Sequence, residues 1–151
     1  MNANQKVQTL MEGKEKLGMD DELYWFLLYA YGGVPDPGYL DDEGFESVMA
    51  CFDMLGLHRY HRINDQDKHK MRGIAMELLK SELAAQKLTG KDARRIAWDF
   101  WGVDAVEWLD LASIGEIIYG LELWRRKNPG RSFMESIESD STDASETGDA
   151  R

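Results

Sequence analysis

The chain has 151 residues, a mass of 17.3 kDa and a formal net charge of −10 at pH 7. This length suits one ordinary domain or two very small ones, and it excludes a large multidomain enzyme. No apolar run approaches the roughly 20 residues that cross a bilayer, and the N-terminus lacks the build of a secretory signal, so we expect a cytoplasmic protein with no membrane partner.

Three helices are predicted in residues 1–57, because apolar residues recur there at three- and four-residue spacings. Gly18 is placed to end the first helix with a left-handed cap, and Gly33 to end the second. Asp20 and Asp41 are placed to cap the second and third helices at their N-termini. The expected inward-facing stripes are Val7, Leu10, Met11, Lys14 and Leu17, then Leu23, Tyr24, Leu27, Leu28 and Tyr31, then Phe45, Val48, Met49, Phe52 and Leu55.

The rest of the chain repeats this scheme with three more predicted helices. One opens at Asp65, one at Thr89 in an approximate capping box, and one at Asp110. Gly102 stops the middle helix, and the Asn-Pro-Gly sequence at residues 128–130 forbids extension of the last. The expected buried stripes are Met71, Ile74, Ala75, Leu78 and Leu79, then Ala93, Ile96, Ala97 and Phe100, then Ile114, Ile117, Ile118, Leu121 and Trp124.

The two halves match without a gap when the first is shifted by 69 residues. The shift places Gly33 on Gly102 and Asp41 on Asp110, and the apolar stripes coincide. We therefore predict an all-α fold of about six helices in two related three-helix units, with chance register between amphipathic helices as the alternative. Neither unit is long enough to be stable alone, so we expect their apolar faces to share a core.

Charge and composition divide the chain into four segments. Residues 1–57 form an N-terminal three-helix unit of net charge −8, and residues 58–72 form a basic connector, net +3, that runs into the next helix. Residues 73–131 form a C-terminal helical unit that is neutral overall. Residues 132–151, net −5, are rich in Ser, Thr and acid. They predict a disordered acidic tail that keeps the protein soluble or competes for a basic surface.

Basic side chains gather in the connector and at the end of the last predicted helix. Together with Tyr60 they are typical of surfaces that follow a phosphate backbone, so contact with DNA is one hypothesis. The alternatives are a solvated connector and cations that complement helix dipoles. The candidate nucleic-acid-binding residues are Arg59, Arg62, Lys68, Lys70, Arg72, Arg125, Arg126, Lys127 and Arg131.

Three aromatic residues of the second helix, Trp25, Phe26 and Tyr29, exceed what a single narrow buried stripe needs. Tyr and Trp dominate the energetics of protein interfaces, so these three residues are candidate contacts for a partner protein. The alternative is a wide buried face at which the two units meet.

No pattern in the sequence predicts a cofactor, a metal site or catalysis. The three histidines and Cys51 lie near one another, but their spacing is a poor match to structural zinc sites. The acidic clusters at residues 20–22 and 41–43 coincide with predicted helix starts, where capping explains them. Ser-His-Asp arrangements, P-loops and dinucleotide-binding glycine patterns are absent from the sequence. We therefore predict that the protein is not an enzyme and holds no cofactor.

Two groups of residues resemble the GemA family of regulatory proteins of Mu-like phages. They are the string Leu-Gly-Met-Asp-Asp-Glu-Leu-Tyr at residues 17–24, and the Gly-Val and Glu-Trp-Leu strings at residues 102–103 and 107–109. The resemblance covers roughly residues 6–126. It implies a phage protein in the host bacterial cytoplasm that modulates host gene expression by relaxing host DNA supercoiling through DNA gyrase.

The residues and the resemblance together predict a noncatalytic regulator of host transcription or DNA topology that acts through a host protein, with DNA contact as a secondary mode. Two other functions stay open. A nucleic-acid-binding accessory factor of phage replication would use the connector and the helix ends. An acidic DNA mimic would use the charge of residues 1–57 to occupy a host DNA-binding protein.

Overall fold

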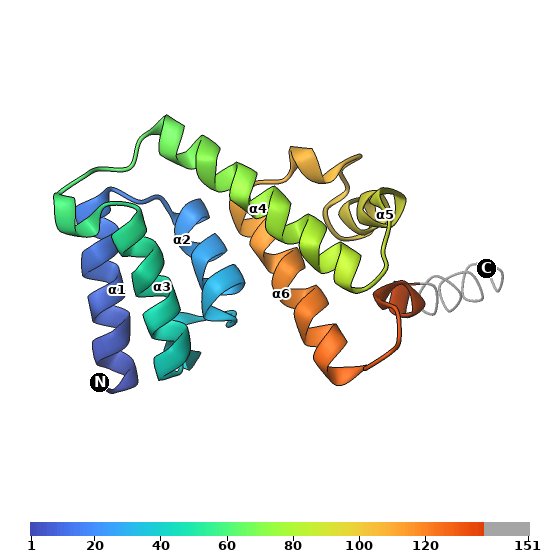
Figure 1. Ribbon diagram of the computed structural model, residues 1–151, viewed down its shortest axis with the longest axis horizontal. Coiled ribbons are helices and arrows are strands. Elements are labelled where there is room, and N and C mark those ends of the chain that lie inside the picture. Colours follow the sequence, from blue (N-terminus) through green and yellow to red (C-terminus); the bar gives the residue numbers. More distant parts are fainter. Residues whose placement is uncertain (138–151) are drawn as a thin grey trace, which may run out of the picture.

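The computed structural model describes residues 1–137, which form an all-α fold (Figure 1). Helices α1 to α6 follow the predicted order and residues 133–137 are helical as well, so the predicted all-α fold class is confirmed. None of the helices in the described part of the chain combines the length and the apolarity needed to span a membrane. The prediction of a disordered tail falls largely on residues 138–151, which lie outside the described residues.

Each unit contains three α-helices and at least one short helical turn. The N-terminal unit contains α1 (Ala3–Leu17), α2 (Asp21–Leu27), the π-helical turn η1 (Leu28–Gly32), the 3-10 turn η2 (Pro37–Tyr39) and α3 (Asp42–Met54). The 3-10 turn η3 (Leu57–Arg59) leads to the C-terminal unit, which contains α4 (Asp65–Ala85), α5 (Gly90–Trp101), the 3-10 turn η4 (Val106–Trp108) and α6 (Leu111–Lys127).

The helices begin where side chains satisfy free backbone amides. The Asp20 carboxylate accepts from the Leu23 amide at 2.9 Å, and the Asp41 carboxylate accepts from the Gly44 amide at 2.7 Å. Asp110 caps α6 in the same way. These bonds offset the cost of unpaired amides in the first turn. The predicted capping roles of Asp20, Asp41 and Asp110 are therefore confirmed.

The 69-residue relation between the units extends to single turns of the backbone. The shift carries η2 onto η4, and it carries the first residues of α2 and α3 onto those of α5 and α6. Gly33 and Gly102 end corresponding helices with φ values of 66° and 67°. Gly18 corresponds to Lys87, and both have left-handed φ values, 61° and 59°, although a lysine rarely adopts this conformation. The two units are thus related in backbone conformation as well as in apolar pattern.

Helix α2 belongs to the N-terminal unit and lies at its junction with the C-terminal unit, so it is covered on two sides. Figure 1 shows α1 and α3 on one side of α2 and α6 on the other. Phe26 of α2 is fully buried, and a Cβ at Gly115 of α6 would lie 3.0 Å from the Phe26 Cα. Only a glycine allows the two helix backbones to come this close. One core therefore runs through both units, as expected from the sequence.

A group of charged side chains joins α2 to both α4 and α6. Glu22 accepts from the backbone amide of Leu111 at 2.7 Å through one oxygen, and from Lys68 of α4 at 3.2 Å through the other. Lys68 also donates to Asp20 at 2.6 Å. A carboxylate at the N-terminus of α6 satisfies a free amide and complements the helix dipole. These contacts fix the beginning of α6 against α2.

The ionisation of Asp20 and Lys68 follows from these contacts. Burial alone would raise the pKa of the Asp20 carboxyl, but hydrogen bonds from Lys68 and the Leu23 amide and the nearby positive charge outweigh it, so this pKa lies below the usual value. The hydrogen bond to Asp20 in turn raises the pKa of Lys68. Both groups are therefore charged at neutral pH.

Two residues predicted to be buried are exposed. Met11 is 49% exposed because it lies at the edge of the α1 stripe, and α1 is covered on one side only. Phe100 is 58% exposed because the end of α5 stands away from α6. The predicted positions of Met11 and Phe100 in the core are wrong.

The connector runs into the next helix at the predicted residue. Helix α4 begins at Asp65, where Asn64 and Asp67 make a capping box, and residues 65–72 form its first two turns. One predicted segment boundary is wrong. The predicted tail begins at residue 132, but residues 133–137 are helical. Met134 and Ile137 are buried, because the large apolar side chains of the tail are concentrated in this stretch.

Replacement of Lys68 by Met is expected to lower the free energy of unfolding by about 0.5–1 kcal/mol at pH 7, since the pair with Asp20 is partly exposed. The folded-state pKa of Asp20 lies below its unfolded value, so the unfolded chain takes up the proton first and stability is lost as the pH falls below about 4. Lys68→Met should weaken this dependence, as measured by urea unfolding between pH 7 and pH 3. Lys16→Met, at an exposed position of α1, is the control. An unchanged dependence in Lys68→Met would contradict the role of the pair.

Candidate functional site

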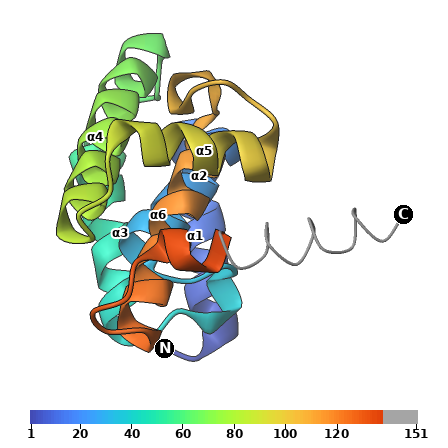
Figure 2. The same ribbon diagram turned by 90° about the vertical axis from the view of Figure 1, so that its right-hand side faces the viewer.

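An apolar cleft lies between α5 and α6. Figure 2 shows α5 running across the direction of α6, and the cleft between the two helices has a volume of about 290 Å³. Tyr29 of η1 and Phe133 also line it. Apart from Glu116 its lining side chains are apolar or aromatic. The principal walls are Ile96, Phe100 and Trp101 of α5, and Ile117, Gly120 and Leu121 of α6.

Large aromatic side chains are exposed in the C-terminal unit. Phe100, which lines the cleft, is 58% exposed, and Trp98 and Trp108, which do not line it, are 59% and 78% exposed. Phe133 contacts the Phe100 ring at a centroid distance of 6.3 Å and the Trp124 ring at 5.8 Å. Exposed aromatic groups beside an apolar hollow are typical of a surface that binds another molecule.

The two units differ in sequence at two positions beside the interface between these helices. In the N-terminal unit, a Cβ at Gly44 would lie 2.9 Å from the Gly32 carbonyl oxygen, so these glycines let η1 and α3 pack directly together. The 69-residue shift replaces Gly32 by Trp101 and Gly44 by Ser113. The indole of Trp101 needs room that a glycine does not, and it stands in the wall of the cleft. This exchange of glycine for tryptophan is the sequence signal that could have located the site.

The size and composition of the cleft determine what it can hold. Burial raises the pKa of the Tyr29 hydroxyl, as do the neighbouring Glu116 and Tyr119, so Tyr29 is neutral at physiological pH. The cleft volume lies at the lower limit for small-molecule pockets, which are roughly 300–1,000 Å³. A cleft of this size and composition accommodates one large apolar side chain.

The structure changes the assignment of the three aromatic residues predicted to bind a partner. Phe26 is fully buried against α6 and cannot contact a partner in the folded protein, so that prediction is wrong. Trp25 is half-buried and packs edge to face on Tyr24. Tyr29 alone of the three borders the cleft, and its ring lies 5.7 Å from that of Tyr119. The two-sided burial of α2 explains why it carries so many aromatic residues.

The candidate nucleic-acid-binding residues divide into two groups. One group surrounds η3 and the beginning of α4, and the other lies at the end of α6, far away in the molecule (Figure 1). Most of these side chains bind other parts of the protein. Four of them pair with carboxylates: Lys68 with Asp20 and Glu22, Arg125 with Glu82, Arg126 with Glu122 at 3.8 Å, and Arg131 with Glu135. Two donate to backbone carbonyls, Arg59 to that of Met54 and Arg72 to that of Glu107. Arg62 lies against Gly18. Lys70 and Lys127 are exposed.

The contact between Arg125 and Glu82 is the most buried of these pairs. The side chain of Glu82 is only 7% exposed, and its two oxygens accept from Arg125 at 3.0 and 3.1 Å. Gln86 donates to the same carboxylate at 3.0 Å. Burial raises the pKa of the adjacent Glu122, and the charge of Glu82 raises it further. Arg125 therefore neutralises a buried carboxylate between α4 and α6.

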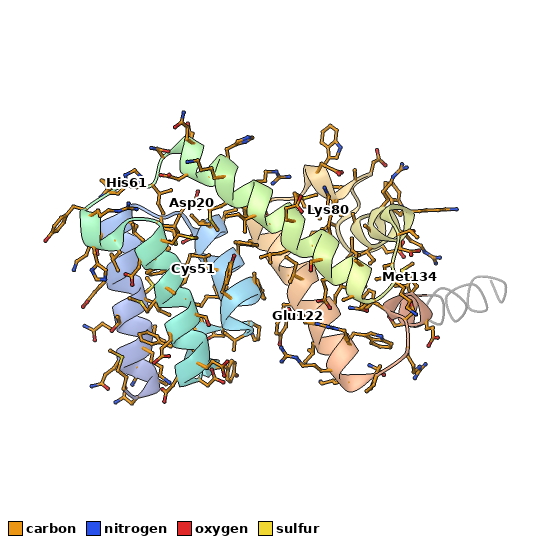
Figure 3. The ribbon with its side chains drawn as sticks, viewed as in Figure 1. Asp20, Cys51, His61, Lys80, Glu122 and Met134 are labelled. Carbon is orange, nitrogen blue, oxygen red and sulfur yellow. The ribbon has the colours of Figure 1, made fainter. Side chains whose placement is uncertain are left out.

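The histidines and the cysteine are used separately. Figure 3 shows His61 in the connector and Cys51 on α3. His61 lies 2.7 Å from Asp67, and His58 lies 2.8 Å from Asp53. Burial raises the pKa of Cys51 to about 11, so its thiol is protonated at neutral pH and is a poor nucleophile. Within residues 1–137, no three His, Cys, Asp or Glu side chains come together in a way that could hold a metal ion.

No protein-family model, curated protein or solved structure matches the chain.

Replacement of Arg125 by Ala is expected to lower the free energy of unfolding by about 2 kcal/mol, because it leaves the Glu82 carboxylate buried without its cation. Arg126→Ala is a matched control one residue away. Its pair with Glu122 has a longer separation and Arg126 is 71% exposed, so the expected loss is below about 0.5 kcal/mol. Urea unfolding of the two variants at pH 7 measures the difference. Equal losses would contradict the structural role of Arg125.

Proposed function

We propose that the protein is a noncatalytic regulator that binds a host protein through the cleft between α5 and α6. The observation that carries the proposal is the exposed Phe100 beside an apolar cleft with room for one large side chain. Clefts of this kind receive the anchoring residue of a partner, and such anchors contribute most of the binding energy of an interface.

The resemblance to the GemA family supports a more specific version of the proposal. In it, the protein is a phage regulator in the bacterial cytoplasm, and the host partner is DNA gyrase or another protein that controls DNA topology or transcription. The internal pairing of most candidate basic residues favours a protein partner over DNA, because Arg125 and Lys68 would have to leave buried or partly buried carboxylates to bind phosphate.

The first test compares two exposed aromatic residues. Phe100→Ala removes the aromatic group beside the cleft, and Tyr39→Ala removes a residue of η2 that is 74% exposed and does not line the cleft. Binding of each folded variant to purified DNA gyrase is measured by biolayer interferometry. We expect Phe100→Ala to weaken binding by roughly tenfold or more and Tyr39→Ala to leave it unchanged.

The outcomes separate the site from the partner. If Phe100→Ala binds as tightly as the unaltered protein, the cleft is not the binding site. If the unaltered protein neither binds gyrase nor changes its supercoiling activity, the gyrase assignment is wrong, and the same pair of variants then tests the cleft against proteins captured from a bacterial lysate.

A further inference from the structure

A second pocket lies where the connector leaves the N-terminal unit. It is enclosed by the end of α3, the residues around η3 and the first turns of α4, and it shares no lining residue with the cleft between α5 and α6. Its volume is about 730 Å³, against about 290 Å³ for the cleft. Pockets of roughly 300–1,000 Å³ hold small organic molecules. This pocket therefore has room for a whole ligand rather than for one side chain.

The connector wall of the pocket is held in place by several contacts. The His61 amide donates to the Gly56 carbonyl oxygen at 3.2 Å, and a Cβ at Gly56 would lie 2.6 Å from the His61 Cβ. The His61 ring lies 2.7 Å from the carboxylate of Asp67 on α4. The Ile63 amide donates to the Leu17 carbonyl oxygen at 2.7 Å. Because these bonds tie the wall to α4 and to the end of α1, a ligand has little of the protein to order when it binds.

Two cations line the pocket, and neither pairs with a carboxylate in the described part of the chain. Lys70 is exposed and makes no ion pair there. Arg59 makes one long hydrogen bond, 3.4 Å from its Nη2 to the Met54 carbonyl oxygen, which leaves its other N–H groups free. Guanidinium and ammonium groups with free donors are the side chains that bind phosphate.

The one carboxylate in the lining, that of Asp67, is already hydrogen-bonded. Its Oδ2 accepts from the Asn64 amide and lies against the His61 ring. Hydrogen bonds from His61 and Asn64, together with the charges of His61 and Lys70, hold the pKa of Asp67 below its usual value. Asp67 is therefore ionised at neutral pH, but Arg59 and Lys70 outnumber it, and the lining keeps a net positive charge.

Apolar and aromatic side chains complete the lining. Met71 is only 2% exposed, whereas Met54 is 57% exposed and Tyr60 is 93% exposed, so the last two contribute little to the core. Tyr60 also has a left-handed φ of 56°, a conformation that a tyrosine rarely adopts outside functional sites and turns. A tyrosine ring stacks on flat aromatic groups, and methionine sulfur packs well against them.

We propose that this pocket binds a nucleotide, with Arg59 and Lys70 on its phosphate groups and the Tyr60 ring against its base. An inorganic anion would leave the apolar surface of Met54 and Met71 unused, and an uncharged apolar ligand would leave both cations without a counter-ion. The net charge of −10 opposes nonspecific adhesion of polyanions to the rest of the surface. Binding would therefore depend on this local arrangement.

The test is isothermal titration calorimetry of the full chain with ATP, without divalent cations and in roughly 150 mM salt, which screens weak surface attraction. We expect a dissociation constant of about 100 µM. Arg59→Ala and Lys70→Ala should each raise it by roughly fivefold or more, because each removes a charge-assisted hydrogen bond. Lys127→Ala removes an exposed cation outside the pocket and should leave it unchanged. Circular dichroism checks that each variant is folded.

Tyr60→Gly tests the contribution of the base. Glycine adopts the left-handed conformation of residue 60 readily, so this variant removes the ring and keeps the backbone. It should weaken the binding of ATP and leave the weaker binding of inorganic tripolyphosphate unchanged.

The proposal is overturned if ATP fails to bind at 1 mM, on the order of ten times the expected dissociation constant, or if Arg59→Ala and Lys70→Ala bind it as tightly as the unaltered protein. Tripolyphosphate that binds as tightly as ATP would overturn it as well, because the site would then recognise any polyanion. Binding of single-stranded oligothymidylate without binding of ATP would assign the cations to a nucleic-acid backbone and overturn the pocket. None of these measurements uses the partner of the cleft, so their failure leaves the proposed function standing.

Discussion

The close approach of α2 to α6 is the contact on which the rest of the structure depends. Phe26 lies directly against Gly115, and Glu22 binds the first amide of α6 while Lys68 of α4 binds Glu22. One face of α2 packs within its own unit. The contact with α6 covers the opposite face of α2 and joins the apolar faces of the two units into one core. Units of this size rarely bury enough apolar surface to be stable alone.

Differences between the two units explain how one scaffold provides both a stable core and a binding site. Where the N-terminal unit has Gly32, the C-terminal unit has Trp101, which lines the apolar cleft. Where α2 has the buried Phe26, α5 has Arg95, which lies at the surface and pairs with Asp99. The repeated backbone sets where these faces lie, and the side chains decide whether each face is buried, charged or open.

Features governed by neighbouring residues were predictable from the sequence. The capping aspartates, the left-handed Gly18 and the 69-residue relation depend on short-range chemistry or on pattern, and the structure confirms them. Properties that depend on tertiary packing were not. Phe26 and Phe100 both fit an aromatic-rich helix, but Phe26 is buried against α6, whereas Phe100 lines an open cleft and is exposed. The positive charge of Arg125 is visible in the sequence. Its pairing with the buried Glu82 is not, because Glu82 lies on another helix.

The most direct test of the central contact is the stability of Gly115→Ala relative to Gly73→Ala. Alanine in place of a glycine within a helix normally stabilises it by about 0.5–1 kcal/mol, and nothing lies within 4 Å of a Cβ at Gly73 on α4. Gly73→Ala should therefore raise the free energy of unfolding in urea. At Gly115 the added methyl meets the backbone of Phe26, so this variant should lose about 1–3 kcal/mol. A Gly115→Ala protein as stable as the unaltered chain would contradict the account.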